Sequence, residues 1–196
     1  MDTSRIVLAS TSPYRRALLQ RLRLPFDVLA PRLDEAALPD EAPRATALRL
    51  ARAKADDVAA RAVDALVIGS DQVADVEGRA LSKPGTHDAA LDQLERMQGR
   101  TIVFHTALAV VDAARGAALV DTVPTAVRFR RLPRTELDAY LRAETPYDCA
   151  GAAKIEGLGI ALVESVESDD PTALIGLPLI RLVAMLEHFG VRVLGR

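Results

Sequence analysis

Two short, fully apolar runs set strict limits on how this chain can fold. Ile6 to Ala9 and Ala65 to Ile68 each have the length of a β-strand, and polar residues follow each of them at once. Continuous apolar strands are typical of a sheet buried on both faces, because both alternating sets of side chains must leave water. The sequence therefore predicts a sheet covered by helices, with polar turns after these strands, including Gly69 to Gln72.

Helical patterns lie between the predicted strands. Ser12 is a good N-cap and Pro13 suits a first helical position, so a helix should begin there and end at Leu24-Pro25. Pro43 also stands where a helix would begin, and apolar residues then recur at helical spacing through about Arg61. Strands and helices are thus interleaved along the first third of the chain.

The middle of the chain predicts hairpins. Val73 to Val76 and Arg79 to Leu81 are joined at Glu77-Gly78, and Thr101 to Val111 should pair with Leu119 to Arg131 as an antiparallel ribbon. Hairpins exclude a purely parallel sheet, so the expected fold class is α/β, with a mixed sheet flanked by helices. The other expected elements are strands at 26–29 and 160–166 and helices at 87–97, 135–143 and 178–189.

Composition limits the possible partners. The 196 residues include 25 basic and 27 acidic side chains, so no overall field favours nucleic acid or an anionic membrane. The first residues show no apolar region or cleavage site typical of a signal peptide, and no apolar stretch is long enough to span a bilayer, so we expect neither a leader nor a membrane span. Cys149 is the only cysteine, which excludes an intramolecular disulfide and fits a cytoplasmic protein; we expect it to be a small buried side chain.

The turn after the first strand is a candidate phosphate site. Ser10, Thr11 and Ser12 supply hydroxyl groups, and Arg15 and Arg16 supply guanidinium groups at the start of a helix. Free backbone N–H groups, the helix dipole and an arginine fork all favour a bound phosphate. A plain helix cap with solvated arginines fits the same residues.

Carboxylates and lysines extend this candidate site. Asp34-Glu35 and Asp71 follow predicted strands, where they could hold Mg²⁺ or act as a general base. Lys54 and Lys83, two of only three lysines, could bind phosphate as point charges. Solvated surface positions remain the alternative for each. No Walker A, H-E-x-x-H or Cys-x-x-Cys pattern is present, and the three histidines are scattered.

Together these segments resemble the Maf family of nucleoside triphosphate pyrophosphatases, once described as septum-formation inhibitors. The resemblance covers nearly the whole chain, and several spaced motifs occur in one order. They are Leu8 to Arg16, Asp34-Glu35, Arg52 to Ala55, Gly69 to Gln72, Lys83-Pro84, Cys149 to Gly151 and Gly176 to Leu179.

The resemblance implies a fold, a reaction and a set of roles. The expected fold is one Maf-like domain over residues 1–196, with an elongated mixed sheet and two lobes around a cleft. The expected reaction hydrolyses a nucleoside triphosphate between the α- and β-phosphates with a divalent cation, Mg²⁺ or Mn²⁺, and a homodimer is possible. Asp71 would be the proton acceptor, and Glu35 with Asp71 would hold the metal. The remaining implied phosphate-binding residues are Ser10, Arg15, Lys54 and Lys83.

Three positions bear on the substrate. Family members acting on dTTP and UTP typically have Arg, Thr and Gln where this chain has Tyr14, Gln72 and Glu156. The pattern here looks like the subgroup acting on 7-methyl-GTP. An aromatic face can attract the methylated, positively charged guanine, and a carboxylate can accept hydrogen bonds from its N1–H and amino group. A dTTP/UTP pyrophosphatase and a non-catalytic cell-division regulator are the competing hypotheses.

Overall fold

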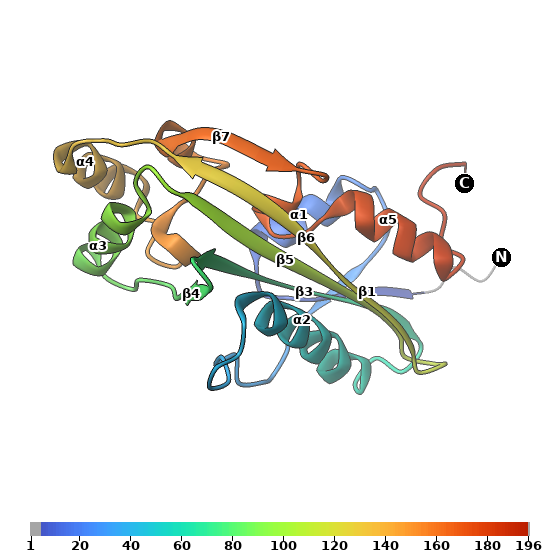
Figure 1. Ribbon diagram of the computed structural model, residues 1–196. Helices are drawn as coiled ribbons and strands as arrows, with labels where there is room; N and C mark the ends of the chain where they lie inside the picture. Colours follow the sequence, from blue (N-terminus) through green and yellow to red (C-terminus); the bar gives the residue numbers. More distant parts are fainter. Residues whose placement is uncertain (1–4, 196) are drawn as a thin grey trace.

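The computed structural model describes residues 5–195, in which one mixed sheet carries helices on both faces (Figure 1). Among these residues the sheet has seven strands, in the order β2-β1-β3-β5-β6-β7, with β4 paired to β3. The strands are β1 (Arg5–Ala9), β2 (Asp27–Leu29), β3 (Ala65–Val76), β4 (Arg79–Leu81), β5 (Thr101–Asp112), β6 (Ala117–Phe129) and β7 (Val163–Ser168).

Five α-helices and three short 3₁₀ turns complete the described chain. The helices are α1 (Pro13–Gln20), α2 (Pro43–Ala59), α3 (His87–Met97), α4 (Arg134–Glu144) and α5 (Leu179–His188). The 3₁₀ turns are η1 (Ala150–Ala152), η2 (Leu158–Leu162) and η3 (Ala173–Ile175). In Figure 1, α3 and α4 lie together at one end of the elongated sheet, and α2 lies on the face opposite α1 and α5. No helix within residues 5–195 is both long and apolar enough to cross a membrane.

The strand pairing confirms the expected mixed sheet. Strands β2, β1 and β3 run parallel to one another, whereas β3, β5, β6 and β7 pair as antiparallel neighbours. Strands β5 and β6 form the predicted long ribbon, and β3 and β4 form the predicted hairpin. Glu77 and Gly78 both have positive φ in that hairpin, as a tight two-residue turn requires.

Local chemistry explains where two of the helices begin. Helix α1 starts at Pro13, and the Ser12 hydroxyl oxygen accepts a hydrogen bond from the Arg15 N–H at 3.3 Å. Helix α3 starts after Thr86, whose side-chain oxygen accepts from the Ala89 N–H at 3.3 Å. The predicted Ser12 cap is therefore confirmed, and Thr86 caps the helix expected at 87–97.

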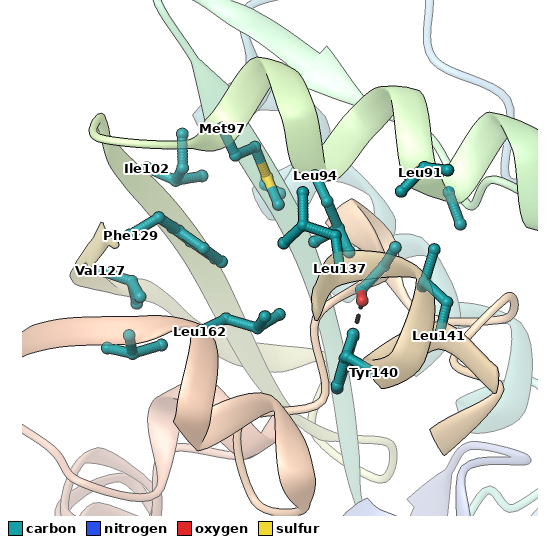
Figure 2. Close-up of a cluster of buried hydrophobic side chains, with 14 of the residues drawn as sticks. Leu91, Leu94, Met97, Ile102, Val127, Phe129, Leu137, Tyr140, Leu141 and Leu162 are labelled. Atoms are coloured by element: carbon teal, nitrogen blue, oxygen red, sulfur yellow. Dashed lines mark hydrogen bonds between the residues drawn. The ribbon is translucent and has the colours of Figure 1, made fainter. Parts of the chain in front are cut away.

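Three apolar clusters hold the layers together. Alternate residues of β1, β3 and β5 pack against α1 and α5 on one face and against α2 on the other. The third cluster lies at the far end of the sheet, where α3 and α4 cover β5 and β6 (Figure 2). Its largest buried side chains include Phe104, Leu94, Met97 and Leu137. The elongated sheet thus has a separate core at each end, and the cavity described below lies between them.

A glycine sets the distance between α2 and the sheet. A Cβ atom on Gly69 of β3 would lie 2.2 Å from the Ala51 carbonyl oxygen and 2.8 Å from the Ala55 backbone nitrogen. Only glycine allows this close approach of two backbones. The approach brings Lys54, on the same stretch of α2, close to the next inward-facing residue of β3 on that face, Asp71.

Three expected boundaries are wrong. The chain does not turn at Gly69 to Gln72, because β3 continues to Val76 and pairs with β5 along this whole stretch. The last strand begins at Val163 rather than Ile160, since residues 158–162 form η2. Helix α1 ends at Gln20, before a short turn in which Arg23 has a positive φ of 54°.

Candidate active site

A gap between two strands creates the main cavity. Strand β1 ends where Ala9 pairs with Gly69, and β4 does not join β3 until Leu81 pairs with Ala74. Between these points, residues 70–73 of β3 have β5 on one side and, among the described strands, no neighbour on the other. A cavity of about 320 Å³ lies beside this gap, at the carboxyl end of β1. Ligand sites in α/β sheets commonly lie at such strand ends.

Arg16 and Asp34, which were also singled out from the sequence, do not line this cavity, whereas the nine residues to which the resemblance assigns roles all do. They come from six separate segments, and they are Ser10, Tyr14, Arg15, Glu35, Lys54, Asp71, Gln72, Lys83 and Glu156. The polar segments after Ala9, Ile68 and Leu81 therefore meet at one cavity, and the middle segment is a strand rather than the predicted turn.

Lys54 joins two carboxylates at the buried side of the cavity. Its Nζ donates to Glu35 Oε2 at 2.6 Å and to Asp71 Oδ1 at 2.7 Å. The side chains of Lys54 and Asp71 are only 5% and 10% exposed, whereas Glu35 is 53% exposed. Asp71 Oδ2 accepts no hydrogen bond from any described residue, so one oxygen of this buried carboxylate is available to a ligand or a water.

The loop that carries Glu35 is fastened to α2 by a second ion pair. Glu41 accepts two hydrogen bonds from Arg49, each of 2.7 Å, and further ones from the Thr46 hydroxyl and the Leu38 N–H. Hydrogen bonding to Arg49 is the main cause that lowers the pKa of Glu41 to about 2. This anchor holds the loop near Lys54 without using a residue of the cavity.

Arg15 is held by the chain that follows η3. Its Nε donates to the Gly176 carbonyl oxygen at 2.9 Å, and the buried Ser70 hydroxyl lies 2.9 Å from the same oxygen. Burial lowers the pKa of Arg15 from its ordinary value, while the charges of Asp71 and Glu35 raise it. The guanidinium stays charged. It therefore adds a fixed positive charge beside the two carboxylates.

Lys83 is the uncommitted cation of the cavity. It is exposed and forms no hydrogen bond or ion pair with any residue of the described chain. Its loop is nevertheless held in place, because the Gly85 N–H donates to the Tyr147 carbonyl at 3.0 Å and Gln93 donates to the Ser82 carbonyl at 2.9 Å. An ammonium group so placed can reach a mobile anion without first breaking a bond.

The three expected base-specificity residues are in different states. Glu156 is exposed at the cavity and makes no hydrogen bond to a described residue, whereas the Gln72 amide nitrogen lies 3.0–3.1 Å from the carbonyls of Leu174 and Ala173. Tyr14 is partly buried, and the Lys154 Nζ lies 5.5 Å from the centre of its ring. Gln72 thus orders the segment beside the cavity, and Glu156 remains open to a ligand.

The sequence did not indicate that Asp148 lines the cavity, and it wrongly predicted that Cys149 is buried. Asp148 lines the cavity as an exposed carboxylate, and nothing in the local sequence distinguished it from other surface acids. Cys149 lines it too and is only partly buried, so the expected buried apolar role is wrong. Burial is still the main cause that raises the pKa of its thiol to about 12, with Asp148 adding to it. The thiol therefore stays protonated.

The carboxylate pair suits a cation that arrives with a phosphate ligand. Residues 5–195 contain no group of three or more His, Cys, Asp or Glu side chains that could hold a metal alone. Mg²⁺ is commonly bound by one or two carboxylates together with substrate phosphates. Glu35 and Asp71 share a single ammonium group, so they offer such a pair.

Fold and cavity together define a class: a mixed α/β protein whose polar cavity suits a phosphorylated small molecule. The family model for Maf-like proteins matches residues 5–189. The chain therefore belongs to the Maf family.

Several relatives carry the same name. A protein of Cupriavidus metallidurans is 58% identical over 190 residues, which cover 97% of this chain and 96% of its own. One of Burkholderia pseudomallei is 60% identical over 194 residues, covering 97% and 90%. One of Burkholderia orbicola is 62% identical over 186 residues, covering 93% and 88%. Each is named 7-methyl-GTP pyrophosphatase.

Proposed function

We propose that this protein is a 7-methyl-GTP pyrophosphatase, which hydrolyses the α–β phosphoanhydride to 7-methyl-GMP and pyrophosphate. The observation that carries the proposal is the convergence of all nine expected residues on one cavity. The name shared by relatives at 58–62% identity supports the same substrate.

The phosphate part of the cavity accounts for the reaction. Water attacks the α-phosphorus, a new P–O bond forms, and the bond from phosphorus to the bridging oxygen breaks. Asp71 accepts the proton of the attacking water through its free oxygen. Arg15, Lys54 and Lys83, with the Ser10 hydroxyl, bind the phosphate oxygens and stabilise the departing pyrophosphate.

A divalent cation, Mg²⁺ or Mn²⁺, belongs to this proposal. Glu35 and Asp71 would hold it jointly with the phosphates, and it would supply neutralisation of the charge that develops on the phosphate oxygens. Lys54 occupies both carboxylates in the free protein. Its ammonium group would therefore shift towards the phosphates as the substrate enters.

The base part of the cavity accounts for the substrate. Glu156 would accept hydrogen bonds from the guanine N1–H and amino group, and Tyr14 would stack on the cationic methylated ring, an interaction worth about 0.5–2 kcal/mol. Asp148 adds a further negative charge to the lining of the cavity. A positively charged base is favoured there over a neutral one.

Initial rates of pyrophosphate release test the proposal, with 7-methyl-GTP, GTP, UTP and dTTP each supplied with Mg²⁺ or Mn²⁺. We expect the highest kcat/KM for 7-methyl-GTP; a preference for the pyrimidine nucleotides would instead support a dTTP/UTP pyrophosphatase. Asp71→Asn should lower kcat by at least about a hundredfold. An unchanged rate would refute its role as the base.

A matched variant tests the base assignment separately. Glu156→Gln keeps the size of the side chain but presents an amide N–H group towards the guanine donors. We expect it to reduce the preference for 7-methyl-GTP over UTP by about tenfold or more while turnover of UTP persists. Equal losses on both nucleotides would contradict a role in base choice.

Two broader expectations are also part of the proposal. The two ends of the sheet act as lobes of one domain on either side of the cavity, and the protein functions as a homodimer. Sedimentation at several protein concentrations measures the oligomeric state directly, and a monomer at every concentration would exclude the homodimer.

A further inference from the structure

We propose that Lys154 is a positioning residue that holds the Tyr14 ring against the base of the substrate. The inference rests on the proposed function and adds a residue that does not itself line the cavity. Lys154 does not line the cavity, although Ala153 and Glu156, on either side of it in the chain, do. Tyr14 lines the cavity as well. Because Lys154 contacts the ring without lining the cavity, we infer that it lies on the face of the ring away from the cavity and leaves the other face open to the base.

The contact between the two side chains is direct. The Lys154 Nζ lies 5.5 Å from the centre of the Tyr14 ring, within the range in which a cation is attracted to an aromatic face. Tyr14 belongs to α1 and Lys154 to the segment between η1 and η2, so the contact joins two elements that border the cavity from different parts of the chain. Freedom of the ring to turn away from the cavity is thereby reduced.

Glu144 at the end of α4 fixes the lysine from its other side. Its Oε1 pairs with the Lys154 Nζ at 2.8 Å, and its Oε2 accepts from the Leu158 N–H at 2.9 Å. Both side chains are well shielded, with 25% of Lys154 and 16% of Glu144 exposed. Glu144, followed by Tyr14, raises the pKa of Lys154, so the ammonium group stays charged.

The backbone of Lys154 is equally well anchored. Its N–H donates to the Tyr140 hydroxyl at 3.0 Å, and that hydroxyl donates in turn to the Ala152 carbonyl at 3.2 Å. Figure 2 shows this tyrosine at the edge of the apolar cluster beneath α3 and α4. The Lys154 carbonyl accepts from Gly157 and Gly159, each at 3.0 Å. The lysine is thus a rigid support built on the far core.

Glu144 also offsets the positive charge of Lys154. A lone ammonium behind the ring would repel the positive charge of a methylated guanine in front of it. Pairing with Glu144 offsets that charge locally, so Lys154 can hold the ring without opposing a cationic base. This balance predicts different effects on charged and neutral bases, which a purely structural role would not produce.

The test is a double-mutant cycle on nucleotide hydrolysis, using Lys154→Met and Tyr14→Leu singly and together. We expect Lys154→Met to raise KM for 7-methyl-GTP about three- to tenfold with little change in kcat, because it weakens ring placement rather than chemistry. In the Tyr14→Leu background the same change should alter KM less than about twofold, since the ring is gone. Lys154→Arg, which keeps the cation, should retain most of the wild-type affinity.

Two comparisons separate positioning from folding. Arg128→Met removes an exposed cation that pairs with Glu164 outside the cavity, and it should leave KM unchanged. Glu144→Gln should raise KM for 7-methyl-GTP more than KM for GTP, because the lysine charge that repels the cationic base is then no longer offset. Additive effects of Lys154→Met and Tyr14→Leu on KM, or equal losses on both nucleotides with Glu144→Gln, would overturn the proposal.

Failure of the proposed function would be recognised separately. A wild-type enzyme that prefers UTP would show that the substrate is wrong, and the same cycle measured on UTP would still decide whether Lys154 acts through Tyr14. Coupling between the two residues on UTP supports the positioning role, and its absence refutes it.

Discussion

Replacing Lys54 by methionine removes the ammonium group between Glu35 and Asp71 while keeping a side chain of similar length. Lys54 and Asp71 are 5% and 10% exposed, so the variant leaves a buried carboxylate without its partner at 2.7 Å. Breaking a buried pair in this way typically costs about 3–5 kcal/mol. Glu35 is 53% exposed and adds little, and nearby Arg15 offsets part of the loss. We therefore expect a loss near 3 kcal/mol.

Urea unfolding followed by circular dichroism measures this loss, because the chain has no tryptophan for fluorescence. The double variant Lys54→Met with Asp71→Asn removes the orphaned charge and should recover at least half of the stability without restoring hydrolysis. Lys83→Met is the matched control: it removes an exposed, unpaired cation, so stability should stay within about 0.5 kcal/mol while KM rises. An unfolding midpoint of Lys54→Met equal to that of the wild type would refute the reasoning.

Two further predictions concern the scaffold around the cavity. Gly69→Ala should destabilise the protein by about 3 kcal/mol, because its Cβ would lie 2.2 Å from the Ala51 carbonyl, whereas Gly116→Ala, with open space around it, should cost about 1 kcal/mol for its positive φ. Urea midpoints of the two variants check the difference, and equal midpoints would contradict it. Hydrogen bonding to Arg49 lowers the pKa of Glu41 from 4.5 to about 2. The ionised carboxylate therefore stabilises the fold fully above about pH 4.5, and this contribution is lost as the pH falls towards 2. The difference in melting temperature between wild type and Glu41→Gln should shrink over that interval; a difference that grows on acidification would show the sign to be wrong.

The elements that could be predicted from the sequence are those set by local chemistry. Ser12 and Thr86 cap helices through their own hydroxyl oxygens, and Glu77-Gly78 adopts the positive φ values of a tight hairpin. Each of these depends on residues that are neighbours in the chain, so the signal is complete in a short window.

The stretch from Gly69 to Gln72 could not be read in that way. A run of glycine and polar residues after an apolar strand indicates a turn, because buried polar groups need partners. Here the partners are distant in sequence: Asp71 is paired with Lys54, and the Ser70 hydroxyl lies near the carbonyls of Ala107 and Gly176. Tertiary contacts therefore allow a polar segment to continue as a central strand.

In the candidate site, too, some features could be predicted from the sequence and others depend on tertiary contacts. The family resemblance identified nine residues that line the cavity, yet spacing alone did not indicate that Lys54 would join Glu35 to Asp71. Asp148 and the contact between Lys154 and Tyr14 were missed, since both depend on where the fold places the chain after α4. No local pattern marks such a contact.

Under the proposed function, phosphate binding and base choice depend on different segments of the cavity lining. Cations that suit phosphate come from α1, α2 and the loop after β4, whereas the carboxylates Asp148 and Glu156 come from the segment after α4. That segment is held by Tyr140 and Glu144 on α4, which belongs to the far core rather than to the phosphate side. Changes between residues 148 and 156 should therefore alter the choice of base while the chemistry at phosphorus persists. Changes at Lys54 or Asp71 should stop hydrolysis of every nucleotide alike.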